Sequence, residues 1–423
     1  MRAELIAIGS ELLLGENVDT NSAWVSARLA EVGVDVYRHV TVGDNIERMV
    51  AALREATDRA DVVLTTGGLG PTQDDLTRDA VALVAGVPLE RRADLVEYLE
   101  RYFAASGRDM PASNLRQTDL PVGARVVEAV GTAAGFAVDV ARGGPGASAT
   151  LYCLPGVPSE MELMMSRQVL PELIARGGLA TTISRLVRTA GMGEASVAEA
   201  CGAVVERLEA AGNPTIAFLA SRGETRVRIT GKARDRATAL ALTDPVVDEV
   251  LRALGSNVVG VDEEGVEHAV ARELRRRGMT LAVAESISGG GVGARIVNVP
   301  GASEWFQGGL VTYATPSKVL LGGVDPGLLE AEGPVSEAVA VALARGAAAR
   351  LQADVGLSVV GVAGPTEQGG QEVGVIWMGF AQPGAGIARA RSRRLPARGR
   401  TVVQEWAASV ALDFLRRELD ALG

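Results

Sequence analysis

Cysteine and histidine are both scarce in this sequence of 423 residues. The two cysteines, Cys153 and Cys201, lie far apart in apolar stretches, so they match neither a zinc site nor a disulfide framework. The two histidines, His39 and His268, belong to no cluster, which argues against histidine-based catalysis and histidine-rich metal binding. We therefore expect buried thiols in a reducing, cytoplasmic compartment.

Long apolar runs and an excess of positive charge are also missing. No run approaches the length of a membrane span, and the start Met1-Arg2-Ala3-Glu4 does not resemble a signal peptide. A net charge of −10 should repel nucleic acid and anionic membranes. With 47% hydrophobic and 22% charged residues, the composition is globular, and the length predicts two or three domains.

A glycine-rich turn is the most informative feature of the first half of the chain. It follows the apolar run 61–64 and precedes a helix-like run at 76–84. Its glycines let backbone amides approach a phosphate at a helix N-terminus, and they are Gly67, Gly68 and Gly70. The neighbouring carboxylates Asp74 and Asp75 favour a divalent cation beside that phosphate. The alternative is a turn whose aspartates only cap the helix.

Strands and helices alternate through this first region. Runs at 4–8, 34–40 and 62–66 predict three strands separated by helices, which is typical of a parallel sheet with right-handed crossovers. Asp44 and Asp75 would then both follow the carboxyl ends of strands, where open α/β sheets bind ligands. Two carboxylates from separate loops strengthen the metal hypothesis.

Residues 1–175 resemble the molybdopterin-binding-like domain of the competence/damage-inducible protein A (CinA) family. The resemblance is carried by Gly9-Ser10-Glu11-Leu12-Leu13, Asp19-Thr20-Asn21, Gly67-Gly68-Leu69-Gly70-Pro71-Thr72, Asp74-Asp75-Leu76-Thr77, Gly131-Thr132-Ala133 and Leu154-Pro155-Gly156-Val157-Pro158. It implies an ADP-ribose pyrophosphatase that depends on Mg, Mn or Co. The implied metal ligands are Asp44, Asp74 and Asp75, and the implied substrate-binding residues are Gly67, Gly68, Gly70 and Thr72. Relatives of this fold instead bind molybdopterin and adenylate it.

Residues 176–255 show a small α+β pattern, with one continuous helix expected at 196–210 and a second at 238–254. This region resembles the KH-like middle domain of the same family. A loop of the form GxxG, which clamps a nucleic-acid backbone, is missing in or just after that helix. We therefore expect a spacer or dimerisation element in a homodimer, with no specific nucleic-acid partner.

Residues 256–423 begin a new α/β unit in which a strand at 280–284 again runs into glycines. Ser286 stands in that turn, and Lys318 follows the next strand, at 308–313. A lysine in an apolar pocket can lose its proton at neutral pH and activate a serine, while helix amides near Ser286 would supply an oxyanion site. In isolation, Ser286 has the alternative of being only a helix cap.

This last region resembles the nicotinamide-nucleotide amidohydrolase domain of the CinA family, over residues 260–420. That domain hydrolyses nicotinamide mononucleotide to nicotinate mononucleotide and ammonia, and requires no cofactor. By resemblance Ser286 attacks the carboxamide, Lys318 takes its proton and Tyr313 aligns or relays. The implied substrate-binding residues are Glu285, Ser288, Gly289, Gly290, Gly361, Gly364 and Arg400.

The last region also departs from the family pattern. Ser288 replaces a threonine and Val375 lacks a usual hydroxyl, while the segments 366–368 and 396–400 are altered. Two other interpretations stay open for the whole chain: a pterin-binding or adenylating protein, or a competence- or damage-linked binding protein whose sites have decayed. The predicted fold class is α/β, with a parallel-sheet N-terminal domain, a KH-like α+β middle domain and an α/β amidohydrolase domain.

Overall fold

The structure is a computed structural model that describes residues 1–142, 148–176, 180–221 and 223–422. It divides into two compact units. The first consists of Met1–Ile183 with Gly231–Ala241, and the second of Ser184–Thr230 with Leu242–Gly423. Within the described ranges, no helix is long and apolar enough to cross a membrane.

The first unit is built on a six-stranded sheet. In spatial order its strands are β2 (Asp35–Val42), β1 (Arg2–Ile8), β3 (Val62–Thr66), β8 (Ser148–Leu154), β7 (Gly135–Ala141) and β6 (Arg125–Val127). The first four run parallel, and β7 and β6 are antiparallel to their neighbours. Strand β3 is buried along its whole length, as expected of a central parallel strand rich in β-branched residues. The predicted parallel sheet is confirmed.

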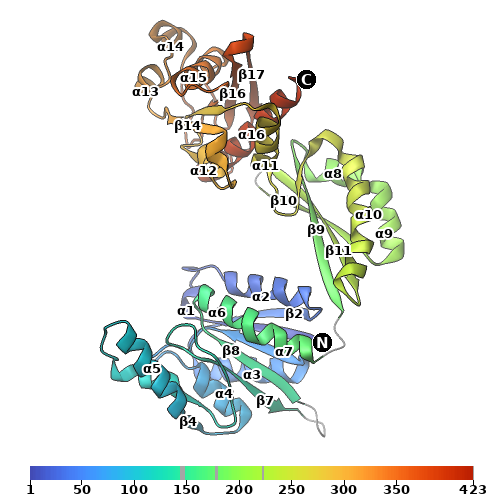
Figure 1. Cartoon of the computed structure of the whole chain (residues 1–423), viewed down its shortest axis with the longest axis vertical. Coiled ribbons are helices and arrows are strands. Elements are labelled where there is room, and N and C mark those ends of the chain that lie inside the picture. The colour runs from blue at the N-terminus through green and yellow to red at the C-terminus, as the bar shows by residue number, and fades with distance from the viewer. Residues whose placement is uncertain (143–147, 177–179, 222, 423) are drawn as a thin grey trace. The chain divides into compact units, whose positions relative to one another are not determined.

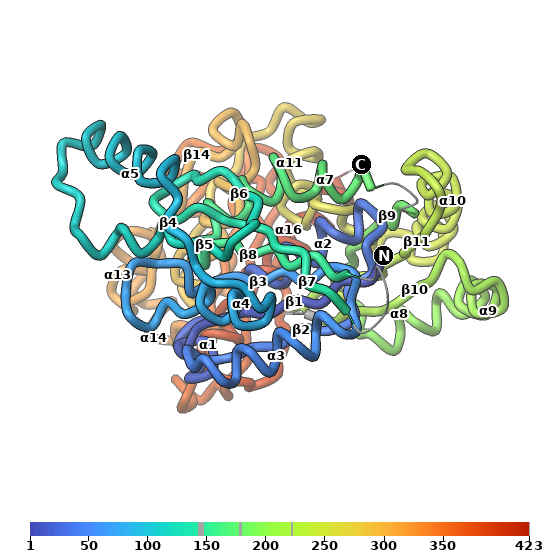
Figure 2. Tube along the Cα trace, turned by 90° about the horizontal axis from the view of Figure 1, so that it is seen from below, coloured from blue at the N-terminus to red at the C-terminus, as the bar shows by residue number. Residues whose placement is uncertain are grey.

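Helices cover both faces of this sheet (Figure 1). One face packs against α2 (Thr20–Glu31), α6 (Pro158–Met164) and α7 (Leu170–Ala175), and the other against α3 (Ile46–Arg59) and α4 (Thr77–Ala85). Helix α5 lies at the margin of the unit (Figure 2). Helix α5 spans Ala93–Ala105. The shorter elements of this unit are α1 (Ser10–Leu13), β4 (Leu89–Arg91) and β5 (Asp119–Pro121).

The middle of the chain forms a four-stranded sheet with three helices packed against it. In order the strands are β10 (Thr215–Ser221), β11 (Glu224–Ala233), β9 (Thr181–Ala190) and β12 (Val258–Val261). The helices are α8 (Glu194–Ala200), α9 (Gly202–Ala211) and α10 (Arg236–Leu254). The prediction of one continuous helix at 196–210 is wrong, because the helix is interrupted at Cys201, which separates α8 from α9. Strand β12 carries this sheet past residue 255, where the sequence predicted the middle region to end.

The remainder of the second unit is a five-stranded sheet between two helical layers. In order its strands are β14 (Phe306–Val311), β13 (Leu281–Glu285), β15 (Val355–Gly361), β16 (Val375–Gln382) and β17 (Ile387–Arg394). The first three are parallel, and β16 and β17 are antiparallel. One face packs on α14 (Pro326–Glu332) and α15 (Glu337–Arg350), and the other on α11 (Val266–Arg277), α12 (Gly291–Val297) and α16 (Arg400–Asp420). The predicted α/β class is confirmed here too.

Candidate functional site

Ser286 lies directly after β13, at the carboxyl edge of the parallel part of the sheet. Its backbone amide donates to the carbonyl of Val359 on the neighbouring strand at 2.9 Å, which fixes the turn to β15. The side chain is buried. Helix α12 begins only after Gly290, its N-cap, so Ser286 does not cap it. The helix-cap alternative for Ser286 is therefore wrong in this structure.

Lys318 comes from α13 (Thr315–Leu320), the helix that follows β14. Its Nζ lies 2.9 Å from Ser286 Oγ and donates to the carbonyl of Thr312 at 2.8 Å. The side chain is only 2% exposed, and in the described part of the chain it has no carboxylate partner. Burial without a counter-charge lowers the pKa of Lys318 from 10.5 to about 8. The neutral amine that a general base requires is therefore accessible near neutral pH.

Glu285 has a different place from the substrate-binding one that the resemblance implied. Its carboxylate is buried beneath the turn and accepts hydrogen bonds from the amides of Gly290, Val292 and Gly293 and from the hydroxyl of Ser288, at 2.6–3.1 Å. Glu285 therefore takes the helix amides that the sequence predicted for an oxyanion. Gly289 and Gly290 have positive φ and supply the turn conformation.

A cavity of about 300 Å³ opens in front of the Ser286–Lys318 pair. It contains the predicted residues Tyr313, Gly361, Gly364 and Arg400, whereas Glu285, Ser288, Gly289 and Gly290 are not part of its lining. Arg400 begins α16, and its guanidinium donates to the carbonyl of Gly364 at 2.6 Å and to the hydroxyl of Tyr313. A Cβ on Gly361 would lie 2.6 Å from the carbonyl of Val375, so only glycine permits this close packing.

Some of the residues that depart from the family pattern line the cavity, and others lie outside it. Thr366, Glu367 and Gln368 line the cavity, and sequence reasoning did not count them as site residues. Val375 is absent from the lining. Ile287, the residue after Ser286, also lines the cavity, and its backbone N–H has no acceptor within the described ranges. The amide that follows a nucleophilic serine is a common oxyanion donor.

In the first unit, the glycine turn after β3 is packed against the chain's own atoms. A Cβ on Gly67 would lie 2.2 Å from the carbonyl of Ile8, and one on Gly68 would lie 2.3 Å from the hydroxyl of Thr77. A Cβ on Gly70 would lie 2.5 Å from the carboxylate of Asp75. The close approaches that the sequence assigned to a phosphate are made here by strand β1, helix α4 and Asp75.

Asp75 closes this turn from within. Its carboxylate accepts from the amides of Gly70 and Thr72 at 2.7 and 2.8 Å and from the Thr72 hydroxyl at 2.6 Å. The N-cap of α4 is Leu76, so the alternative in which the aspartates cap that helix is also wrong. Buried Arg78, which sequence reasoning missed, donates to the carbonyls of Leu69 and Gly70 at 2.8 and 2.7 Å.

The three predicted metal ligands, Asp44, Asp74 and Asp75, differ in exposure and in hydrogen bonding. Asp44 Oδ2 accepts from the amide and hydroxyl of Ser10 at 2.9 and 2.8 Å, and within the described residues its Oδ1 has no partner. Asp74 is exposed, and both oxygens of Asp75 are used by the turn. The described residues contain no group of three metal-type side chains. Asp75 therefore belongs to the turn, and of the three predicted ligands only Asp44 and Asp74 keep a carboxylate oxygen that the turn does not use.

A cavity of about 320 Å³ lies at the carboxyl ends of β1, β3 and β8. Among its lining residues are Glu11, Asp19 and Asn21, which appear in the family motifs but were not counted as site residues. Asn21 donates to the carbonyl of Gly156 at 2.8 Å, and its buried Oδ1 has no hydrogen-bond partner in the described structure. The cavity thus has polar side chains at the edge of the sheet where open α/β folds bind ligands.

Taken together, the fold and the two sites define a multidomain α/β protein with a serine–lysine pair in its last domain. The family model described as "Probable molybdopterin binding domain" matches residues 4–175, "Damage-inducible protein CinA KH domain" matches 184–260, and "CinA C-terminal domain" matches 263–419.

Full-length relatives give the same result. A CinA-like protein from Frankia casuarinae is 48% identical over 429 residues, covering 100% of this chain and 97% of the relative. One from Thermosynechococcus vestitus is 40% identical over 425 residues, covering 99% of each chain. The crystal structure of CinA from Thermoplasma acidophilum covers 41% of this chain and 97% of its own at 32% identity, with a TM-score of 0.36. The chain belongs to the CinA family.

Proposed function

We propose that the C-terminal cavity hydrolyses the carboxamide of nicotinamide mononucleotide to give nicotinate mononucleotide and ammonia. The observation that carries this proposal is the 2.9 Å contact between Lys318 Nζ and Ser286 Oγ, buried and without a carboxylate. A neutral lysine at that distance is within reach of the serine proton. The resemblance to the family's amidohydrolase domain supplies the substrate.

In this proposal the reaction has two halves. Ser286 Oγ attacks the carboxamide carbon while its proton passes to Lys318 Nζ. The negatively charged oxygen of the tetrahedral intermediate accepts a hydrogen bond from the backbone N–H of Ile287. Collapse breaks the C–N bond, and Lys318 returns the proton so that ammonia leaves. Water, deprotonated by Lys318, then attacks the acyl ester, releases the carboxylic acid and restores the Ser286 hydroxyl.

Arg400 is the residue that we assign to the nucleotide phosphate. Its guanidinium is held over the cavity by the Gly364 carbonyl and the Tyr313 hydroxyl, and further N–H donors remain for an anion. Tyr313 then orients Arg400 and borders the substrate. This leaves the proton transfers to Ser286 and Lys318.

The test is ammonia release from nicotinamide mononucleotide by the purified full chain. Ser286→Ala and Lys318→Arg should each remove nearly all turnover, because arginine stays protonated and cannot accept the proton. The matched control is Ser317→Ala on the same helix as Lys318, whose hydroxyl bonds the carbonyl of Ala314 outside the cavity. Undiminished ammonia release in both site variants would overturn the proposal.

A second activity, metal-dependent cleavage of ADP-ribose in the first unit, is favoured by the cavity at the carboxyl ends of β1, β3 and β8, which the polar residues Glu11, Asp19 and Asn21 line. Asp44 and Asp74 follow strands of the same sheet but are not part of the lining of this cavity. In this proposal they would hold the divalent ion together with the substrate phosphates, and the ion would neutralise charge on the pyrophosphate.

We expect cleavage to disappear with a chelator and in Asp44→Asn, and to persist in the control Asp94→Asn on α5. Cleavage that survives both the chelator and Asp44→Asn would contradict this proposal. A melting temperature that rises with added pterin would instead favour pterin binding.

A further inference from the structure

Strand β17, at the edge of the C-terminal sheet, carries an arginine at 389, 391, 393 and 394. In the antiparallel register, Arg391 lies opposite Met378 and Arg393 opposite Ile376. Both partners are buried in the core that includes α16. Because directly opposed residues project to the same face of a sheet, Arg391 and Arg393 point toward the α16 side. Arg394 alternates to the other face, where it pairs with Glu372.

Two of these arginines lack a counter-charge. Arg389, on the same face, pairs with Glu418 of α16 at 2.9 Å. Arg391 and Arg393 are exposed, and neither guanidinium has a hydrogen-bond or ion-pair partner in the parts of the chain that the structure describes. Two guanidinium groups are therefore available side by side on one face of an edge strand.

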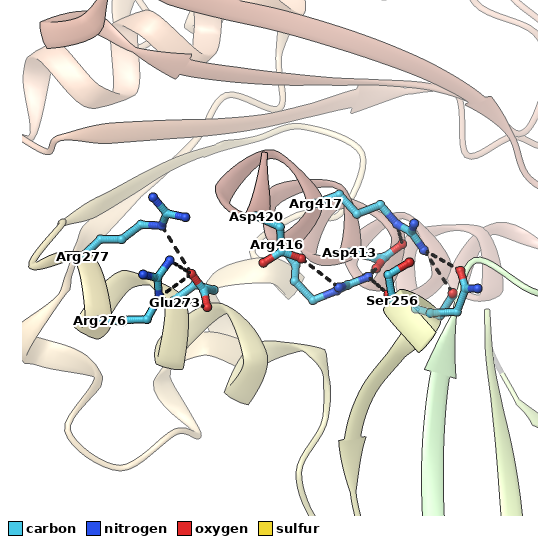
Figure 3. Close-up of polar contacts among 10 residues, drawn as sticks. Ser256, Glu273, Arg276, Arg277, Asp413, Arg416, Arg417 and Asp420 are labelled. Carbon is cyan, nitrogen blue, oxygen red and sulfur yellow. Dashed lines mark hydrogen bonds and ion pairs between the residues drawn. The ribbon is translucent and has the colours of Figure 1, made fainter. Parts of the chain in front are cut away.

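A third guanidinium faces the same space from α16. Arg417 pairs with Asp413 at 2.9 Å and also contacts Asn257 Oδ1 at 3.1 Å and the carbonyl of Ala190 at 3.4 Å. Figure 3 shows Arg416 and Arg417 on either side of Asp413, so two cations share this one carboxylate. A Cβ on Gly191 would lie 3.0 Å from the guanidinium of Arg417, so glycine leaves room for it.

These side chains enclose a cavity of about 360 Å³, which we call the arginine cavity. Its lining residues are Gly191, Asn257, Met378, Arg391, Ser392, Arg393, Val410, Asp413, Phe414 and Arg417. Three arginines against one already paired aspartate give it a net positive charge, in a chain whose net charge is −10. It is separate from the catalytic cavity, with which it shares no lining residue.

We propose that the arginine cavity binds the phosphate or diphosphate group of a small phosphorylated molecule. Guanidinium groups bind phosphate oxygens through paired N–H donors, and Arg391 and Arg393 have these donors free at the cavity. The volume lies in the range of small-molecule pockets, which favours a compact anion over a nucleic-acid strand. The proposal does not depend on the reaction assigned to Ser286.

The experiment is calorimetric titration of the full chain with inorganic pyrophosphate at low ionic strength, where charge-assisted binding is strongest. Arg391→Gln and Arg393→Gln should each raise the Kd about tenfold. The matched control Arg394→Gln makes the same charge change on the neighbouring residue of the opposite face, and should leave the Kd within about twofold. Arg400→Gln removes the phosphate donor that we assign to the catalytic cavity, so the binding that depends on Arg391 and Arg393 should remain in that variant.

Three outcomes would overturn the assignment. They are no binding at millimolar pyrophosphate, binding that persists in both Arg391→Gln and Arg393→Gln, and binding lost in Arg400→Gln instead. Tighter binding of a single-stranded oligonucleotide with the same arginine dependence would reject the small-molecule class. Arg393→Lys keeps the charge and is a second test: an intermediate Kd is expected, since lysine cannot make the paired contact.

Discussion

Two strand-to-helix turns of this chain are built alike, one after β3 and one after β13. In each, glycines with positive φ follow a buried strand, and a nearby carboxylate accepts backbone amides: Asp75 those of its own turn, and Glu285, the last residue of β13, those of its turn and of α12. Each carboxylate also accepts one hydroxyl at 2.6 Å, from Thr72 onto Asp75 and from Ser288 onto Glu285. Both turns resemble anion cradles in sequence, and in both an internal anion already holds the amides.

The turns differ in what a second element brings to them. Helix α13 brings Lys318 to the turn after β13, where its Nζ lies 2.9 Å from Ser286 Oγ. The turn after β3 receives Arg78, which binds its carbonyls from the buried side. In the proposed amidohydrolase reaction, the turn after β13 supplies the nucleophile and α13 supplies its base; among the described residues, no lysine contacts the turn after β3.

Replacing Lys318 with methionine should have the largest effect, because it removes the delivered group that distinguishes the second turn. The change removes the base at nearly constant volume, so ammonia release from nicotinamide mononucleotide should fall roughly 10³-fold. The melting temperature should change little, because the lost hydrogen bond to the Thr312 carbonyl is offset by the removal of a buried ammonium group that has no counter-charge. A variant that loses activity and stability together would mean that Lys318 supports the fold more than the reaction.

The pairing of Ser286 with Lys318 was predictable because each residue follows a strand, and parallel neighbours deliver their carboxyl ends to one edge. Glu285 was not, since a carboxylate next to a nucleophile is as consistent with substrate binding as with capping. The choice depends on where the side chain points. Arg78 and the segment 366–368 were missed for the same reason: their contacts join residues whose proximity only the folded chain defines. The break at Cys201 escaped because the apolar periodicity continues across it.

A comparison of Glu285→Gln with Asp75→Asn would measure how much each internal carboxylate contributes. Glu285 is 2% exposed and accepts four hydrogen bonds, so its loss should cost about 3 kcal/mol. Asp75 is partly exposed and accepts three, so its loss should cost about 1 kcal/mol. Hydrogen exchange at the amides of each turn, read in the full chain, separates the two units. Equal costs would show that burial does not distinguish the turns.

The pH dependence of ammonia release sharpens the role of the delivered lysine. Because burial lowers the pKa of Lys318 to about 8, kcat/KM should rise about tenfold per pH unit below 8 and level off above it. Stability should follow the same group: between pH 8 and 10.5 the unfolded chain binds more protons, so the wild type should gain stability there as pH rises. Lys318→Met should lack this gain. A rate that is flat from about pH 6 to 9 would exclude Lys318 as the base.

The two hydroxyl contacts should give the smallest effects and the closest comparison. Thr72→Val and Ser288→Ala each remove one 2.6 Å hydrogen bond to the internal carboxylate. Thr72 is exposed, so water can replace its hydroxyl and the free energy of unfolding should fall by no more than about 0.5 kcal/mol. Ser288 donates to a buried carboxylate that water reaches poorly, so its loss should cost about 1–2 kcal/mol. Urea unfolding of the full chain measures both. If Thr72→Val costs more than Ser288→Ala, the first turn depends on its hydroxyl more than its exposure allows, and solvent access is not what separates the turns.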